Sequence, residues 1–180
     1  MFIIFQREKV HFKNLIQYFH ANYSLSGIVF TFQDFKMNLV NISTRGRLGS
    51  GGSYPLLKII LKKEMSIIIA NKQAQKYLFI NQFPKEAIES QLGKHQIVFI
   101  SKDKGLIDKF QKKLNSNPRQ FEFLFDRPFS HIKMESEWQI NSMFMPKKEW
   151  ILSYVGLDPL LYEHPDLLEN SLQSLILLLS

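Results

Sequence analysis

The stretch that most constrains this chain is residues 96–115, which predicts a buried strand that runs directly into an amphipathic helix. Residues 97–101 are mostly apolar, as in a buried strand. Asp103 then offers a side-chain oxygen that can cap the first turn of a helix. The apolar positions that follow recur at helical spacing, at Leu106, Ile107, Phe110 and Leu114. The opposite face carries Lys104, Lys109, Lys112 and Lys113. Such a helix packs its apolar stripe on a sheet and leaves its lysines in the solvent.

Upstream of this unit the sequence predicts one helix and several strands. The helix is expected over residues 7–21, and the strands at 28–32, 37–43, 56–61, 66–70 and 77–81. The last three strands are close in sequence, so we expect them to pair as an antiparallel meander. Residues 84–92 are expected to form a short helix or an irregular segment, and Gly93 and Lys94 a turn.

Downstream, three phenylalanines alternate at Phe121, Phe123 and Phe125. Alternation predicts a strand that buries this face, although aromatic rings beside Arg119 and Arg127 could also stack on unpaired bases. Residues 147–180 are expected to be helical, with a helix beginning at Pro165 and a broad leucine-rich face after it. That face either packs back on the domain or docks on a partner protein.

Charge is divided unevenly along the chain. The formal net charge is +7, but residues 1–113 hold 18 Lys and Arg against 7 Asp and Glu, whereas residues 114–180 hold 5 against 9. A basic body points to a polyanionic partner such as nucleic acid, and the alternative is an ordinary solvated surface. No apolar run reaches the roughly 18 residues that a membrane span needs, so no span is expected.

Residues 44–55 form a loop rich in glycine that also carries Arg45 and Arg47. The glycine spacing fits neither a phosphate-binding loop nor a dinucleotide-binding turn. Two interpretations remain open: a plain hairpin loop, or an arginine-bearing loop that lies against a phosphate backbone.

Catalytic and metal-binding patterns are not evident in the sequence. The chain has no cysteine, which excludes disulfides, thiolate zinc sites and cysteine nucleophiles. His11 and His20 lie nine residues apart, a spacing that does not suggest a shared metal. We therefore expect a binding protein, not an enzyme, with no cofactor and no metal.

The segment from residue 56 to residue 116 resembles the repeat unit of the large-subunit ribosomal protein six family. That family has a strand pair and then a strand and helix that read roughly T-I-V-I-x-G-x-D-K-x-x-V-x-Q-F-A-A-x-I-R, and this chain reads HQIVFISKDKGLIDKFQKKLNS. The matching positions are Ile97, Val98, Ile100, Asp103, Lys104, Ile107, Phe110 and Leu114. Upstream, Gly46, Leu48 and Gly49 are similar to the family's V-x-V-x-G-P-L-G-x-L loop. After the helix the chain departs from the family's P-E-P-Y-K-G-K-G-I run and keeps only Pro118 and Arg119.

The resemblance implies a structural constituent of the ribosomal large subunit that binds ribosomal RNA and contacts other large-subunit proteins. The C-terminal tail, which has no counterpart in that family, is a candidate for one of those contacts. Enrichment in Phe, Ile, Lys and Asn, whose codons are AT-rich, suggests an AT-rich genome, such as that of an organelle or a low-GC bacterium. Taken with the resemblance, it implies a diverged, mitochondrially encoded member of that family that works in the mitochondrion. The alternative is a non-enzymatic protein-interaction module of a low-GC bacterium or plasmid, in the bacterial cytoplasm, that docks through its leucine-rich C-terminal helix.

The expected fold class is α+β, with small antiparallel sheets, helices packed on one face and a helical C-terminal extension. We divide the chain into an N-terminal helix and strand at 1–35, an RNA-binding core at 36–130 and a largely helical extension at 131–180. The residues expected to contact RNA phosphates lie on loops and helix ends: Arg45, Arg47, Lys62, Lys63, Lys102, Lys104, Lys112, Lys113 and Arg119.

Overall fold

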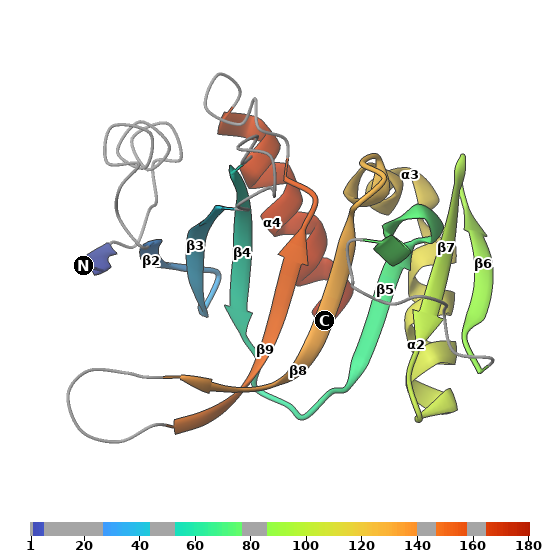
Figure 1. Ribbon diagram of the computed structural model, residues 1–180, viewed down its shortest axis with the longest axis horizontal. Coiled ribbons are helices and arrows are strands. Elements are labelled where there is room, and N and C mark those ends of the chain that lie inside the picture. Colours follow the sequence, from blue (N-terminus) through green and yellow to red (C-terminus); the bar gives the residue numbers. More distant parts are fainter. Residues whose placement is uncertain (1, 6–26, 44–52, 77–85, 140–146, 158–164) are drawn as a thin grey trace.

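The computed structural model describes residues 2–5, 27–43, 53–76, 86–139, 147–157 and 165–180. Its strands form one nine-stranded sheet in the order β1-β2-β3-β4-β9-β8-β5-β7-β6 (Figure 1). Strands β2 to β9 pair antiparallel with their neighbours, and β1 pairs parallel with β2. The strands are β1 (Phe2–Phe5), β2 (Gly27–Phe32), β3 (Phe35–Ser43), β4 (Ser53–Ile60), β5 (Ile67–Asn71), β6 (Ile88–Leu92), β7 (His95–Ile100), β8 (His131–Gln139) and β9 (Lys147–Val155). The predicted α+β class is therefore confirmed, but the expected small sheets are wrong, because the described strands join into one large sheet.

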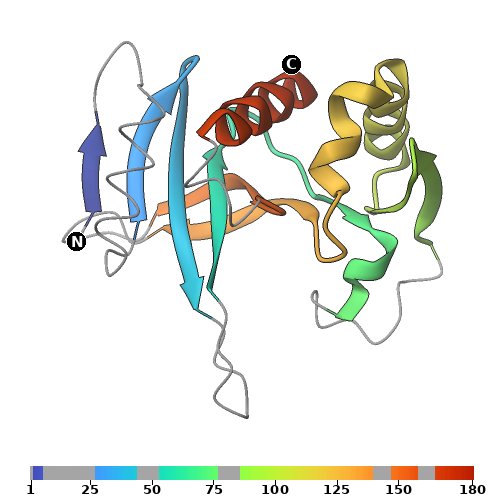
Figure 2. The same cartoon turned by 90° about the horizontal axis from the view of Figure 1, so that it is seen from above.

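The described helices flank this sheet. They are α2 (Lys104–Ser116), α3 (Pro118–Phe121) and α4 (Pro165–Leu179), with the short 3₁₀ helices η1 (Lys72–Lys76) and η2 (Glu122–Phe125). α2 and α4 contact one another, and both bury apolar side chains in one core. Figure 2 shows the ribbons of α2 and α3 side by side. None of these described helices is long and apolar enough to cross a membrane. The helix expected at 7–21 and the strand expected at 77–81 lie outside the described residues.

The strand-to-helix unit and four of the upstream strands are confirmed. β2, β3, β4 and β5 occupy the predicted positions within a few residues, and β7 leads into α2 as expected. The turn at Gly93 and Lys94 is also present, with Gly93 at a φ of 55°.

The predicted meander is wrong. β4 pairs with β3 and β9, whereas β5 pairs with β8 and β7. The long β8–β9 hairpin inserts between β4 and β5, so two strands adjacent in sequence are separated by two that come much later. The expected helix or irregular segment at 84–92 is also wrong for residues 88–92, because they form the edge strand β6, which closes a tight hairpin with β7.

The phenylalanine-rich segment is helical, which corrects the predicted strand. α3 begins at Pro118, and η2 continues it to Phe125. Phe121 and Phe125 are four residues apart, so one helical face carries both into the core, and each is at most 1% exposed. Phe123 packs only partly against the core. Burial was predicted correctly and the secondary structure was not.

The C-terminal part combines two strands and one helix. The expectation of a largely helical segment from residue 131 is wrong for β8 and β9, which lie in the middle of the sheet. In β9, Trp150, Leu152 and Tyr154 alternate towards the main core, as strand geometry requires. α4 confirms the predicted helix that begins at Pro165. Its Leu168 and Leu172 are fully buried, so this helix packs back on the chain itself.

Candidate nucleic-acid interface

Side-chain hydrogen bonds fix the start of α2. The carboxylate of Asp103 accepts from the backbone N–H of Leu106 at 3.1 Å, which is the predicted cap. The backbone N–H of Asp103 donates to Ser101 Oγ at 3.1 Å, and Ser101 Oγ donates to the carbonyl of Ser66 at 2.7 Å. The first turn of α2 is therefore tied to the residues that lead into β5.

The buried face of α2 decides which of its lysines face the solvent. Ile107, Phe110 and Leu114 are each at most 1% exposed and anchor the helix in the core. The exposed lysines of the helix are Lys104, Lys109 and Lys112, while Lys113 is half-buried. Burial, and then repulsion from Lys109, lowers the pKa of Lys113 below its ordinary value.

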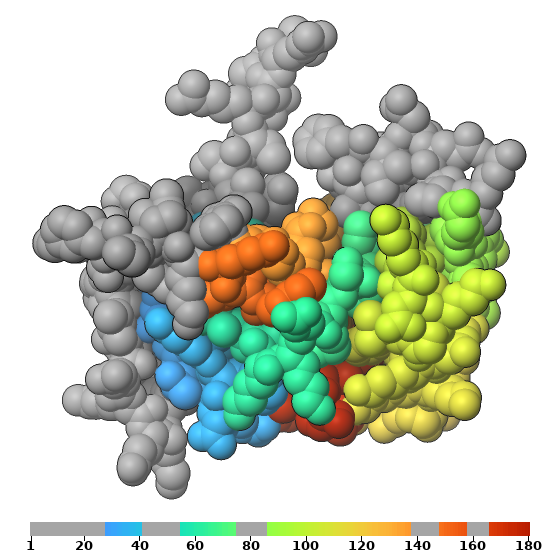
Figure 3. All heavy atoms as spheres, turned by 90° about the horizontal axis from the view of Figure 1, so that it is seen from below, coloured from blue at the N-terminus to red at the C-terminus, as the bar shows by residue number. Residues whose placement is uncertain are grey.

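Four predicted RNA-binding residues gather at one end of the sheet. Lys62 and Lys63 lie in the segment between β4 and β5, and Lys102 and Lys104 follow β7; all four are exposed. The two segments are neighbours because β5 pairs with β7 (Figure 3). Lys62 Nζ also stands 5.4 Å from the centre of the Phe35 ring, close enough for a cation–π contact.

The other predicted residues lie farther along α2 or outside the described part. Lys112 is eight residues after Lys104, about 12 Å along the helix axis. Arg119 follows on α3 and is exposed. Arg45 and Arg47 lie outside the described residues. The predicted set therefore runs from the start of α2 to α3, and the structure does not gather it into one patch.

Most of these exposed cations have no acidic partner within the described part of the chain. No ion pair involves Lys63, Lys102, Lys104, Lys109, Lys112 or Arg119 there. By contrast, Lys58 Nζ lies 2.5 Å from Glu137 Oε2, and Lys133 Nζ lies 2.5 Å from Glu135 Oε1. Those two lysines lie on the strands, and their charges are compensated locally.

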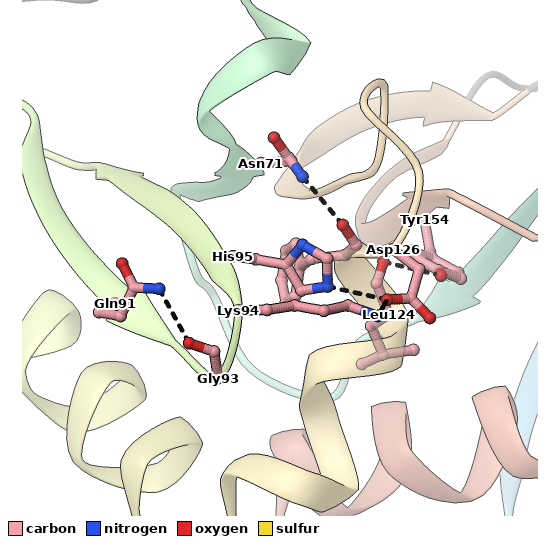
Figure 4. Close-up of polar contacts among 9 residues, drawn as sticks. Asn71, Gln91, Gly93, Lys94, His95, Leu124, Asp126 and Tyr154 are labelled. Carbon is pink, nitrogen blue, oxygen red and sulfur yellow. Dashed lines mark hydrogen bonds and ion pairs between the residues drawn. The ribbon is translucent and has the colours of Figure 1, made fainter.

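Sequence reasoning missed a polar cluster at the opposite end of the sheet. Asp126 Oδ1 lies 3.0 Å from Lys94 Nζ and 2.8 Å from His95 Nε2, and both residues point at it from the β6–β7 hairpin (Figure 4). Burial alone would raise the pKa of Asp126, but hydrogen bonds from Lys94 and His95 and their positive charges outweigh it and lower the pKa. These contacts hold the β6–β7 hairpin against the turn after η2.

Two buried side chains hold the same turn from the sheet side. The Tyr154 hydroxyl donates to the carbonyl of Leu124 at 3.0 Å, and Asn71 Nδ2 donates to the carbonyl of Phe125 at 2.9 Å (Figure 4). Both side chains satisfy carbonyls at the end of η2 that would otherwise be buried without a donor. We read the whole cluster as structural. Nothing in the sequence spacing of these residues could have revealed it.

The exposure of the leucine-rich face of α4 shows how much of this face is available to a partner protein. Leu172 and Ile176 of this face are at most 7% exposed and lie in the core. The exposed large hydrophobic residues of the described part are Leu167 and Leu177.

Metal binding has no visible basis in the described part of the chain, where no three His, Asp or Glu side chains gather closely enough to hold an ion. Comparison with models of known protein families, with curated proteins and with solved structures finds no match to this chain.

Proposed function

We propose that this chain binds ribosomal RNA as a structural constituent of the ribosomal large subunit, through the exposed cations of α2 and its neighbouring segments. The observation that carries the proposal is the row of exposed lysines and one arginine that have no acidic partner within the described residues. In this proposal the helices cover one face of the sheet, and α2 presents its outer surface to the RNA.

What these cations contact before binding decides how much a phosphate can stabilise them. A lysine already paired with a carboxylate must give up that partner to meet a phosphate, and its net gain is small. Lys104, Lys109 and Lys112 have no such partner to lose, and the buried stripe of α2 holds them on a rigid support. Neutralised phosphates release condensed counterions, so binding of this kind weakens steeply with salt.

Ribosomal RNA is the polyanion that we favour because of the resemblance between residues 56–116 and the large-subunit ribosomal protein six family. The predicted mitochondrial location and contacts with other large-subunit proteins belong to the same proposal. About five phosphate contacts would give a slope of log K against log salt of roughly −3.5 to −4.5.

The test neutralises three of the cations together: Lys109→Gln, Lys112→Gln and Arg119→Gln. Filter binding with a large-subunit ribosomal RNA transcript, over about 50–200 mM salt, gives the slope for each protein. Losing three phosphate contacts should make the slope shallower by about 2 to 2.7 and weaken binding at low salt.

A control with the same change in charge is Lys36→Gln, Lys72→Gln and Lys148→Gln, which lie on β3, η1 and β9. We expect this control to keep most of the wild-type slope. Equal slopes for the two triple variants would show that only net charge matters, and a wild-type protein without a salt slope would end the proposal.

A further inference from the structure

A groove of about 970 Å³ opens at the end of the sheet where α2 begins. Its walls come from the segment before β5, the start of β6, the β7–α2 connection, β8 and β9. This volume is in the range of pockets that hold small ligands or short peptide segments. The groove lies where β8 and β9 continue past the start of β5.

The lining of the groove is mainly apolar and only half-buried. Trp150 of β9 and Leu106 of α2 both line the groove, and both are half-buried. Other half-buried apolar residues of the lining are Met65, Ile68, Ile88 and Ile100. Partly exposed apolar surface concentrated in a concave site is typical of a place that another molecule covers.

The charges around the groove are of both signs. Lys102 and Lys104 follow β7, and the strands on either side of β7 begin just after Glu64 and Glu86. All four side chains are exposed and free of ion pairs within the described part.

The remaining charged residues of the lining are already engaged. Lys133 pairs with Glu135, and the carboxylate of Asp103 is used by the helix cap. A polyanion in the groove would therefore meet two free lysines, but also the free carboxylates of Glu64 and Glu86 on both sides of them.

We propose that this groove docks an extended segment of a partner protein, with apolar side chains against Trp150 and Leu106 and with charged residues of both signs at its flanks. Charge complementarity argues for a polypeptide over RNA, since only a polypeptide carries the positive groups that Glu64 and Glu86 call for. The groove shares Lys104 with the proposed RNA surface, which continues along α2 to Lys112 and Arg119, outside the lining of the groove.

The experiment selects peptides from a phage-displayed random library on the full-length chain. Enriched peptides should combine apolar residues with both acidic and basic ones. Their binding is measured by Trp150 fluorescence in a Trp138→Phe background, because the chain has 2 tryptophans. The pair Glu64→Gln and Glu86→Gln should weaken binding about threefold to tenfold. The matched pair Asp108→Asn and Asp166→Asn, exposed but outside the groove, should leave it unchanged.

A second variant, Leu106→Arg, places a bulky charge in the groove and should abolish peptide binding, with far-UV circular dichroism as the check on folding. Three results would overturn the proposal: no enriched peptides, enrichment that Leu106→Arg does not reduce, or polyuridine RNA that displaces the peptide and alters Trp150 emission even when Lys109, Lys112 and Arg119 are neutralised. The triple variant at Lys109, Lys112 and Arg119 separates the two ideas, because it should weaken RNA binding and leave peptide binding intact.

Discussion

The buried phenol of Tyr154 yields a prediction that can be worked out in numbers. The side chain is 1% exposed, and its hydroxyl donates to the carbonyl of Leu124 at 3.0 Å. Burial, and then the negative charge of Asp126, raises the pKa of Tyr154 far above the ordinary value of 10.0. The phenol therefore stays neutral in the folded protein at pH values where it ionises in the unfolded chain.

Tyr154→Phe removes the donor and leaves the Leu124 carbonyl buried without it. The expected loss of free energy of unfolding is about 1–3 kcal/mol near neutral pH. At alkaline pH a second effect appears. Above about pH 10 the folded state holds a proton that the unfolded state has lost, so the wild-type protein loses about 1.4 kcal/mol of stability per pH unit from this group. The variant lacks the group and is spared that loss.

The assay is urea denaturation of both proteins at about pH 8, 9, 10 and 11. All other titrating groups are common to the two chains, so their contributions cancel in the difference. The difference in unfolding free energy should be constant up to about pH 9 and shrink by about 1.4 kcal/mol at about pH 11. A difference that stays constant over the whole range would show that the hydroxyl is not withdrawn from solvent as described.

Two further predictions concern the parts around this residue. Gly93→Ala should cost about 1–2 kcal/mol in urea denaturation, because φ at Gly93 is 55° and the new Cβ would meet the Glu122 carboxylate. Gly105→Ala in the first turn of α2 should cost less, because its gain in helix propensity is offset by a Cβ only 3.3 Å from the cap oxygen Asp103 Oδ1; equal effects would contradict this. Asp126→Asn should reduce the loss of unfolding free energy at acid pH. The reason is that a carboxyl group with a lowered pKa stabilises the folded state, and this stabilisation is lost as the pH falls through that pKa, below 3.8. Identical acid profiles for the two proteins would argue against the stabilising contacts of Asp126 with Lys94 and His95.

The α2 unit could be predicted because its determinants are local. The cap at Asp103 and the stripe of Ile107, Phe110 and Leu114 lie within one turn or two of each other, so spacing alone specifies the helix and its buried face. The exposure of Lys109 and Lys112 follows from the same periodicity.

The phenylalanine segment shows where spacing is ambiguous. Positions 121, 123 and 125 satisfy the alternation of a strand, but the first and last are also four apart, as on a helix. Pro118, which is well suited to the first position of a helix, selects the second alternative. A short apolar pattern cannot decide this by itself, and burial was the only safe inference.

The position of β4 relative to β5 could not be predicted, because the strands that separate them lie more than 60 residues farther along the chain. The groove has the same origin, since its lining comes from five segments that no local pattern connects. The ion pair between Lys58 and Glu137 joins residues 79 positions apart.

The long-range pairing of strands also explains why the net charge of the sequence does not show which lysines remain unpaired. The insertion of β8 places Glu137 next to Lys58, and Lys133 pairs with Glu135 on its own strand. The positive charges of these two lysines are therefore neutralised, although the net charge of the composition counts them as free. α2 has one acidic residue, Asp108, among its lysines, and its buried stripe keeps those lysines outside. The fold brings some lysines next to carboxylates and, within the described residues, leaves others unpaired. The unpaired lysines are the ones that a polyanion could contact. For that reason we place the proposed RNA contact on the outer face of α2 and the proposed peptide contact in the groove beside Glu64 and Glu86.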